Sequence, residues 1–181
     1  MTKLLPTVLL LATLLGLSQC KKKSDPAPGN QLPPTTQTGA NTLGCLVNGQ
    51  AWTPQGNDST SNYTVSYDIF PDGGLLEIGT YRIYGQKTTD HQLLGIWTKR
   101  IHGAGTFSFQ DRANSIATYI DAKSGCYWES RDSATTYRCG QLTITRLDLS
   151  AGIISGTFAF TLYKPGCDTV RITQGRFDKR L

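Results

Sequence analysis

Alternation of apolar and polar side chains constrains this chain more than any other feature of its sequence. Apolar side chains recur at every second residue from Tyr63 to Ile69 and again along Ile154 to Leu162. A period of two places neighbouring side chains on opposite faces, so each segment is expected to be a half-buried β-strand. No long stretch has the three-and-four spacing of an amphipathic helix, and 111–116 would form one helical turn at most. The folded part of the chain is therefore predicted to be all-β.

Turn sequences separate these segments from further strand candidates at 75–84, 92–98, 106–110, 117–120, 142–149 and 170–177. Asn48-Gly49 lies between two short apolar pairs and predicts a tight hairpin. Within 142–149 the alternation changes phase near Arg146, which predicts a β-bulge there. Regular short strands with glycine-containing turns predict one domain, either an antiparallel β-sandwich or a barrel.

The N-terminal residues have the pattern of an export signal. Lys3 precedes an apolar run from Leu4 to Leu17, which fits a signal peptide and is too short to cross a membrane. Leu17-Ser18-Gln19-Cys20 resembles a bacterial lipobox, in which the cysteine becomes the lipid-modified N-terminus, although Gln19 replaces the usual small residue. The alternative is an ordinary secretory signal that leaves Cys20 free.

This pattern divides the chain into three parts. Residues 1–19 are predicted to be a lipoprotein signal peptide, 20–43 a lipidated Cys20 with a disordered Pro/Gly-rich tether, and 44–181 the β-domain. Two or more acyl chains on Cys20 would anchor the protein stably, and Lys21 to Lys23 would add attraction to an anionic surface. The predicted location is the outer membrane, on either its periplasmic or its cell-surface face.

The charge of the chain excludes nucleic acid as a partner. The formal net charge is +5, but four basic residues and one acidic residue precede residue 44, which leaves the domain fourteen basic and twelve acidic side chains, or +2. Nucleic-acid binding needs a basic stripe that this balance does not supply. His91 and His102 lack the spacing of metal ligands, so neither a metal nor another cofactor is expected, and no residue is assigned as catalytic.

The predicted domain contains four cysteines: Cys45, Cys126, Cys139 and Cys167. In an exported protein an even number predicts two disulfides, with three ways to pair them. We favour Cys126–Cys139 together with Cys45–Cys167, because the polar stretch 129–133 reads as a turn between two short strands. The alternatives are four free thiols or a metal site, and no Cys-x-x-Cys spacing supports zinc.

Aromatic and charged side chains offer the remaining candidates for a binding surface. Exposed aromatic rings could stack on sugars or on an apolar ligand, although in β-proteins such rings are more often in the core. The tryptophans are Trp52, Trp97 and Trp128. Two Arg-x-Asp pairs share a strand face and are interpreted as surface charges that pair with adjacent strands, with a substrate clamp as the alternative; they are Arg146 with Asp148 and Arg176 with Asp178.

Three tripeptides resemble the sites at which Bacteroidota attach O-glycans to exported proteins. They are Asp58-Ser59-Thr60, Asp132-Ser133-Ala134 and Asp168-Thr169-Val170. Roughly one such tripeptide is expected by chance at average composition. Ser59, Ser133 and Thr169 are therefore candidate O-glycosylation sites.

Both ends of the predicted domain carry a wider resemblance. Residues 41–54 (NTLGCLVNGQAWTP), 140–148, 154–160 and 172–178 are similar to small lipoproteins of Bacteroidota that are grouped as a domain of unknown function. The resemblance implies a lipobox, a spacer and a single β-domain. It supplies no catalytic residue.

The sequence as a whole predicts a lipid-anchored β-domain of the cell envelope, acting as a binding or envelope-associated module. Besides the membrane, its expected partner is a glycan, an apolar ligand or an envelope protein, and its oligomeric state is left open. The alternatives are a small hydrolase with an unrecognised site and a barrel that carries an apolar ligand. A cleft with paired titratable groups would favour the hydrolase, a dry cavity the carrier, and an exposed aromatic patch the binding module.

Overall fold

A computed structural model describes residues 31–87 and 90–181 and shows eleven strands in them. A six-stranded sheet has the order β2-β1-β11-β10-β9-β6, and a five-stranded sheet has the order β3-β4-β5-β7-β8. The strands are β1 (Thr42–Val47), β2 (Gln50–Trp52), β3 (Tyr63–Asp68), β4 (Gly74–Ile83), β5 (His91–Ile101), β6 (Gly105–Ser108), β7 (Ser115–Asp121), β8 (Cys126–Glu129), β9 (Tyr137–Asp148), β10 (Ile153–Lys164) and β11 (Asp168–Arg180). Every pairing within the two sheets is antiparallel. The described residues form no helix, and hence none that is long and apolar enough to cross a membrane.

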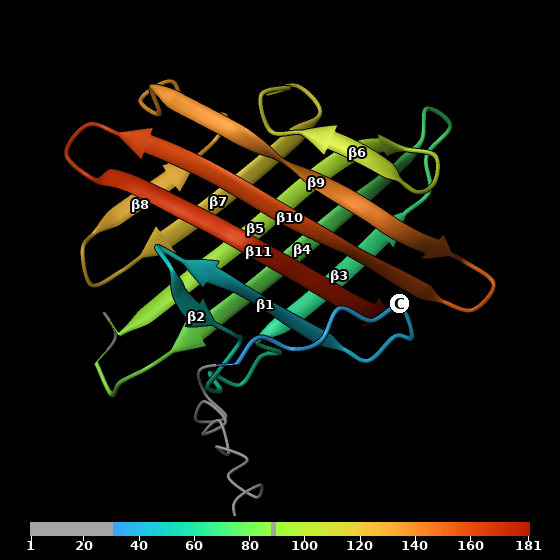
Figure 1. Ribbon diagram of the computed structural model, residues 1–181, viewed down its shortest axis with the longest axis horizontal. Coiled ribbons are helices and arrows are strands. Elements are labelled where there is room, and N and C mark those ends of the chain that lie inside the picture. Colours follow the sequence, from blue (N-terminus) through green and yellow to red (C-terminus); the bar gives the residue numbers. More distant parts are fainter. Residues whose placement is uncertain (1–30, 88–89) are drawn as a thin grey trace, which may run out of the picture.

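The two sheets lie face to face with their strands crossing, as Figure 1 shows. The space between them is filled by alternate side chains from both sheets, as in other sandwiches. Its largest fully buried side chains are Trp52, Phe109, Phe160 and Phe177. Phe109 and Phe160 meet edge to face, with ring centroids 5.6 Å apart. The all-β prediction is confirmed, and of its two forms the chain adopts the sandwich.

Local features of two strand pairs match their sequence patterns. Asn48 and Gly49 connect β1 to β2 with positive φ angles of 49° and 83°, as a tight hairpin turn requires. The register of β9 against β10 shifts between Ile144 and Arg146, which leaves Thr145 as the extra residue. This bulge returns Leu147 to the side of the core, where it is partly buried.

The chain meets the domain earlier than its composition predicts. β1 begins at Thr42, and residues 31–41 (blue in Figure 1) lie beside the C-terminal part of β11. The carbonyl oxygen of Pro33 accepts a hydrogen bond from Arg176 at 3.3 Å, and that of Gln37 accepts one from Arg146 at 2.5 Å. The predicted signal peptide and Cys20 lie outside the described residues.

Asp178 holds this N-terminal segment in place. Although it lies on the outer face of the six-stranded sheet, opposite Ser155, it is only 1% exposed because residues 36–40 cover it. Its carboxylate accepts hydrogen bonds from the hydroxyl groups of Thr36 (2.6 Å) and Ser155 (2.7 Å) and from the backbone N–H groups of Gly39 (2.8 Å), Thr38 (2.9 Å) and Ala40 (3.1 Å). We call these residues the Asp178 cradle.

The cradle corrects part of the interpretation of the Arg-x-Asp pairs. Arg146 and Asp148 do pair, at 2.7 Å, but within their own strand. Asp178 is not a surface charge, because alternation shows which face a side chain takes and not what covers that face. Burial by itself raises the pKa of Asp178, but the hydrogen bonds donated to its carboxylate outweigh burial and lower that pKa below its usual range.

Candidate functional site

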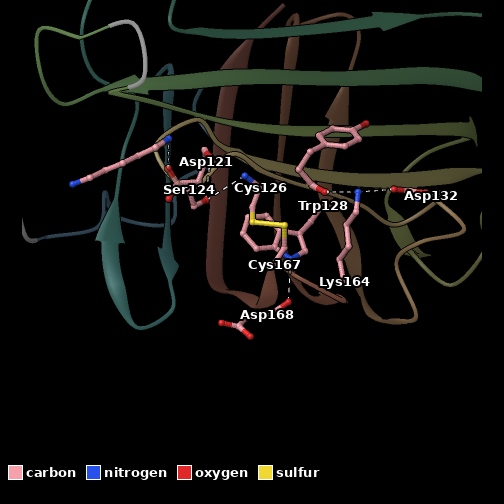
Figure 2. The surroundings of a disulfide bond; sticks show 10 residues. Asp121, Ser124, Cys126, Trp128, Asp132, Lys164, Cys167 and Asp168 are labelled. Atoms are coloured by element: carbon pink, nitrogen blue, oxygen red, sulfur yellow. Dashed lines mark hydrogen bonds and ion pairs between the residues drawn. A yellow bond between two sulfur atoms is a disulfide. The ribbon is translucent and has the colours of Figure 1, made fainter.

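One disulfide joins the two sheets, between Cys126 at the start of β8 and Cys167 in the β10–β11 turn (Figure 2). Their Cα atoms are 5.5 Å apart. The favoured pairing of Cys126 with Cys139 and of Cys45 with Cys167 is wrong. β8 and β9 were expected to form a hairpin, but they enter different sheets, so Cys139 is carried away from Cys126.

The polar side chains around the disulfide are hydrogen-bonded to neighbouring groups of the protein, and they form no reactive centre. The indole N–H of Trp128 donates to the backbone oxygen of Asp168 at 3.2 Å (Figure 2). Lys164 donates to the Asp132 carboxylate at 3.0 Å and to the backbone oxygen of Tyr127 at 3.2 Å. These contacts satisfy the polar groups around the bond and fix β8 to the β10–β11 hairpin.

Cys45 and Cys139 are free thiols. Cys45 is fully buried, and desolvation raises the pKa of its thiol to about 12, so it stays protonated at neutral pH. Cys139 is half-buried, and its sulfur accepts a hydrogen bond from the Tyr137 hydroxyl at 3.3 Å. The raised pKa and the burial of Cys45 argue against a role for it as a nucleophile.

The histidines do not form a common site. His91 is the first residue of β5 and His102 follows its last residue, so a whole strand separates them. Among residues 31–87 and 90–181, no group of three or more His, Cys, Asp or Glu side chains is arranged to hold a metal ion. The O-glycosylation candidates Ser59, Ser133 and Thr169 are all exposed, and their modification stays a prediction.

The three tryptophans divide into two kinds. Trp52 and Trp128 are 1% and 6% exposed, and their indole N–H groups donate to Gln92 at 2.9 Å and to Asp168 at 3.2 Å. Trp97 instead lies half-buried on the outer face of the five-stranded sheet. Its indole N–H has no acceptor within the part of the chain that the structure describes, which leaves this polar group open to solvent or to a ligand.

Trp97 borders a shallow groove that crosses the five-stranded sheet. The floor of the groove is one row of paired residues on four strands: Thr64 of β3, Gly79 of β4, Gly95 of β5 and Thr118 of β7. The neighbouring row on one side is Ser66, Glu77, Trp97 and Ile116. A row two residues away on the other side contains Tyr81, Leu93 and Ile120. We call this groove the glycine trough, with Gly79 and Gly95 at its centre.

The trough exists because two adjacent strands place glycine on the outer face. Its volume is about 350 Å³, which is near the lower end of the size of small-ligand sites. A Cβ atom built on Gly95 would meet only Thr118 Cβ at 3.7 Å and Ile78 O at 3.9 Å, so a larger residue fits there without strain. The backbone therefore does not require this glycine, and its effect is to leave the space above the sheet open.

Sequence reasoning missed the trough. Gly79 and Gly95 both lie within predicted strands, at positions whose neighbours in sequence are buried. Glycine inside a strand often marks the close approach of a ligand to the backbone, so the signal was present. What the alternation does not reveal is that Gly79 pairs with Gly95 across β4 and β5, because this depends on the register.

A second hollow opens at the end of the sandwich, with a volume of about 240 Å³. Its lining includes Trp52, Arg82, Gln92 and Tyr119. Several of its polar groups are already used within the protein: Trp52 donates to Gln92, and Arg82 donates to the backbone oxygen of Ala51 at 3.2 Å. The trough leaves more of its polar groups free and is the stronger candidate for a binding site.

The fold and its surface define the class of this protein as an antiparallel β-sandwich domain with an open groove on one outer face. In a comparison with protein families, residues 75–179 match the family described as Domain of unknown function (DUF6252). The match covers more than half of the chain, which therefore belongs to this family. It runs from β4 to β11 and includes Gly79, Gly95, Trp97 and both disulfide cysteines. Neither the curated proteins nor the solved structures gave a match.

Membership of a family of unknown function confirms part of the expected resemblance. The lipid anchor and the origin in Bacteroidota, which the same resemblance implied, stay predictions. The family description adds no ligand and no reaction, so the function has to be argued from the surface of this chain.

Proposed function

We propose that this chain is a lipid-anchored binding module of the cell envelope, which presents the glycine trough to its ligand. The trough carries the proposal, because it combines an open glycine floor with the free indole N–H of Trp97 and with hydroxyl and carboxylate side chains. Ligand sites commonly join an apolar surface with a few polar groups in this way.

The composition of the trough favours binding over hydrolysis. Glu77 is the one acidic side chain among its lining residues in the described chain. Glycoside hydrolysis ordinarily uses two carboxyl groups on opposite sides of the scissile bond. The carrier alternative is not favoured either, because large aromatic side chains fill the space between the sheets.

The anchor in this proposal is Cys20, located in the outer membrane with the Lys21–Lys23 cluster beside the lipid. Residues after Cys20 would connect it to the Asp178 cradle, where the chain joins the domain. The lipid and the cradle would then determine how far the trough can reach from the membrane.

Metabolic labelling with a fatty-acid probe tests the anchor. Wild-type protein should be labelled and should sediment with membranes, whereas Cys20→Ser should lose both properties. Cys139→Ser is the matched control, because it removes a thiol of the domain and should leave labelling unchanged. Equal labelling of wild type and Cys20→Ser would overturn the anchor.

A photo-crosslinking side chain tests the trough as the binding surface. It is introduced in the full-length protein on cells at Thr118, at one end of the trough, or at Gln141, which is exposed on the other sheet. Adducts should form from position 118 and should be lost when Gly95→Leu fills the trough. Equal adduct formation from both positions, or adducts that persist in Gly95→Leu, would contradict the proposal.

A further inference from the structure

We propose that the glycine trough binds a short segment of a neutral glycan. This inference rests on the proposed function of the trough as a binding surface, and it adds the chemical class of the ligand.

The chemistry of the trough matches both faces of a sugar ring. A pyranose has apolar C–H faces and a rim of hydroxyl groups, so it needs an aromatic surface with hydrogen-bonding groups at its edge. Trp97 supplies the aromatic surface, and its N–H has no acceptor within the described residues. Ser66 and Thr118 supply hydroxyl groups, and Glu77, directly opposite Trp97 in the register, supplies an acceptor for sugar hydroxyls.

The dimensions of the trough suit a chain better than a single ring. Its floor crosses four strands, and at about 4.8 Å between strands the outermost residues, Thr64 and Thr118, are about 14 Å apart. Gly95 lets a ligand lie close to the backbone on this line, whereas at Gly79 the Thr64 hydroxyl, which donates to the Gly79 carbonyl oxygen at 3.2 Å, borders the floor. An extended row of this length, open along one side, accommodates consecutive sugar rings.

The charges around Trp97 favour a neutral glycan. Glu77 is directly opposite Trp97, and the ammonium group of Lys99 lies 5.8 Å from the centre of the Trp97 ring. The ammonium group lies over the ring and takes up part of one face, while Glu77 lies on the neighbouring strand, so groups of both charges are close to the stacking surface. The carboxylate would repel an acidic sugar placed beside it, and the ammonium would repel a basic one.

Direct binding measurements test the inference. The mature full-length protein, purified in detergent, is titrated with a soluble β-glucan, a xylan, a mannan and, as the acidic comparison, a polygalacturonate, and binding is followed by isothermal titration calorimetry, which does not depend on the presence of Trp97. At least one neutral polysaccharide should bind. Trp97→Ala should weaken that binding about tenfold or more, since stacking on the ring is lost. Gly95→Leu should abolish it.

Matched variants separate a blocked site from a damaged fold. Gln141→Leu adds the same side chain on the other sheet and should bind as wild type does. Trp97→Phe should retain part of the binding, because it keeps a ring but loses the N–H. The inference is overturned if no neutral polysaccharide binds, if the polygalacturonate binds more tightly than all of them, or if Trp97→Ala and Gly95→Leu both bind normally. If glycans fail but photo-crosslinking at position 118 still depends on Gly95, the binding surface stands and the ligand class alone is wrong.

Discussion

The β10–β11 hairpin is fastened at its two ends by different chemistry. At its tip, Cys167 is bonded to Cys126 of β8, which links the two sheets covalently. At its open end, Asp178 holds residues 36–40 by hydrogen bonds to a buried carboxylate. A reductant acts on the first fastening, and acid acts on the second.

The difference between these ends follows from what each one holds. Residues 31–41 contain no fully buried side chain, although Pro33 packs over Gly44, so apolar burial attaches them only weakly, and their backbone N–H groups are used as well. β8 is a four-residue strand at the edge of its sheet, with Cys126 and Trp128 facing the core. A short edge strand of this kind gains from a covalent link. Each fastening thus compensates for a small hydrophobic contact.

Removing the disulfide should have the largest effect on stability. The bridge spans 41 residues of sequence, and the loop-entropy relation assigns such a link about 4 kcal/mol. Cys126→Ala combined with Cys167→Ala should lower the free energy of unfolding in urea by about this amount. Cys139→Ala is the control and should unfold near the wild-type midpoint. A double variant as stable as wild type would show that the tip needs no covalent link.

Asp178→Ala should have the next largest effect, about 3 kcal/mol, because several donors lose a charged acceptor at once. Urea unfolding measures it, and proteolysis should cut the released residues 31–41 first. Asp68→Ala, on the exposed face of β3, is the control and should unfold as wild type does. Unchanged protection of residues 31–41 in Asp178→Ala would refute the role of the cradle.

Acid should distinguish the two ends. The pKa of Asp178 is lowered by the cradle, whereas a free Asp titrates near about 3.9. A depressed folded pKa means that the charge stabilises the fold above about pH 4 and that this contribution is lost as pH falls further. The melting temperature of wild type should therefore fall more steeply below about pH 4 than that of Asp178→Asn.

The melting temperature of Asp178→Asn should still fall with pH in acid, but less steeply than that of wild type. The hydrogen bond from Arg146 lowers the pKa of Asp148 as well, so this carboxylate contributes in the same pH range. The variant without the disulfide should keep the full wild-type slope. Parallel curves for wild type and Asp178→Asn would show that the cradle has no part in acid sensitivity.

Thiol labelling should have the smallest effect on stability, because it is done on the wild-type protein and no contact is removed by substitution. In the folded domain, an alkylating reagent should modify Cys139 readily and Cys45 only after unfolding, because Cys45 is buried with its pKa raised to about 12. Mass spectrometry of peptides without reduction should recover Cys126 joined to Cys167. Recovery of Cys126 joined to Cys139 would contradict the fold of this corner.

Local pattern was enough to predict most strands and two of their details. The Asn48-Gly49 hairpin and the bulge beside Arg146 depend only on neighbouring residues, and both are present. The disulfide pairing depends on which sheet each strand enters. β8 and β9 are close in sequence but separate in space, and no periodicity encodes that separation.

The candidate site was harder to predict for a related reason. Alternation places Trp97 and Gly95 on the same face of β5, but it does not bring Gly79 beside them. The same limit applies to Asp178, whose cover comes from residues 36–40, far away in the sequence. Both features depend on contacts between segments that are far apart in the sequence. The alternation of apolar and polar residues carries no information about such contacts.

The cradle also decides how the domain would bear a pulling force. Tension applied to the chain ahead of residue 31 would reach residues 36–40 before it reached any strand. There it would be shared by several hydrogen bonds on one carboxylate, with Arg146 holding Gln37 in the same segment and Arg176 holding Pro33 ahead of it. Bonds that are loaded together resist force better than bonds that open one after another. The cradle therefore bears a pulling force before β1 does, and it delays the separation of β1 from the sheet.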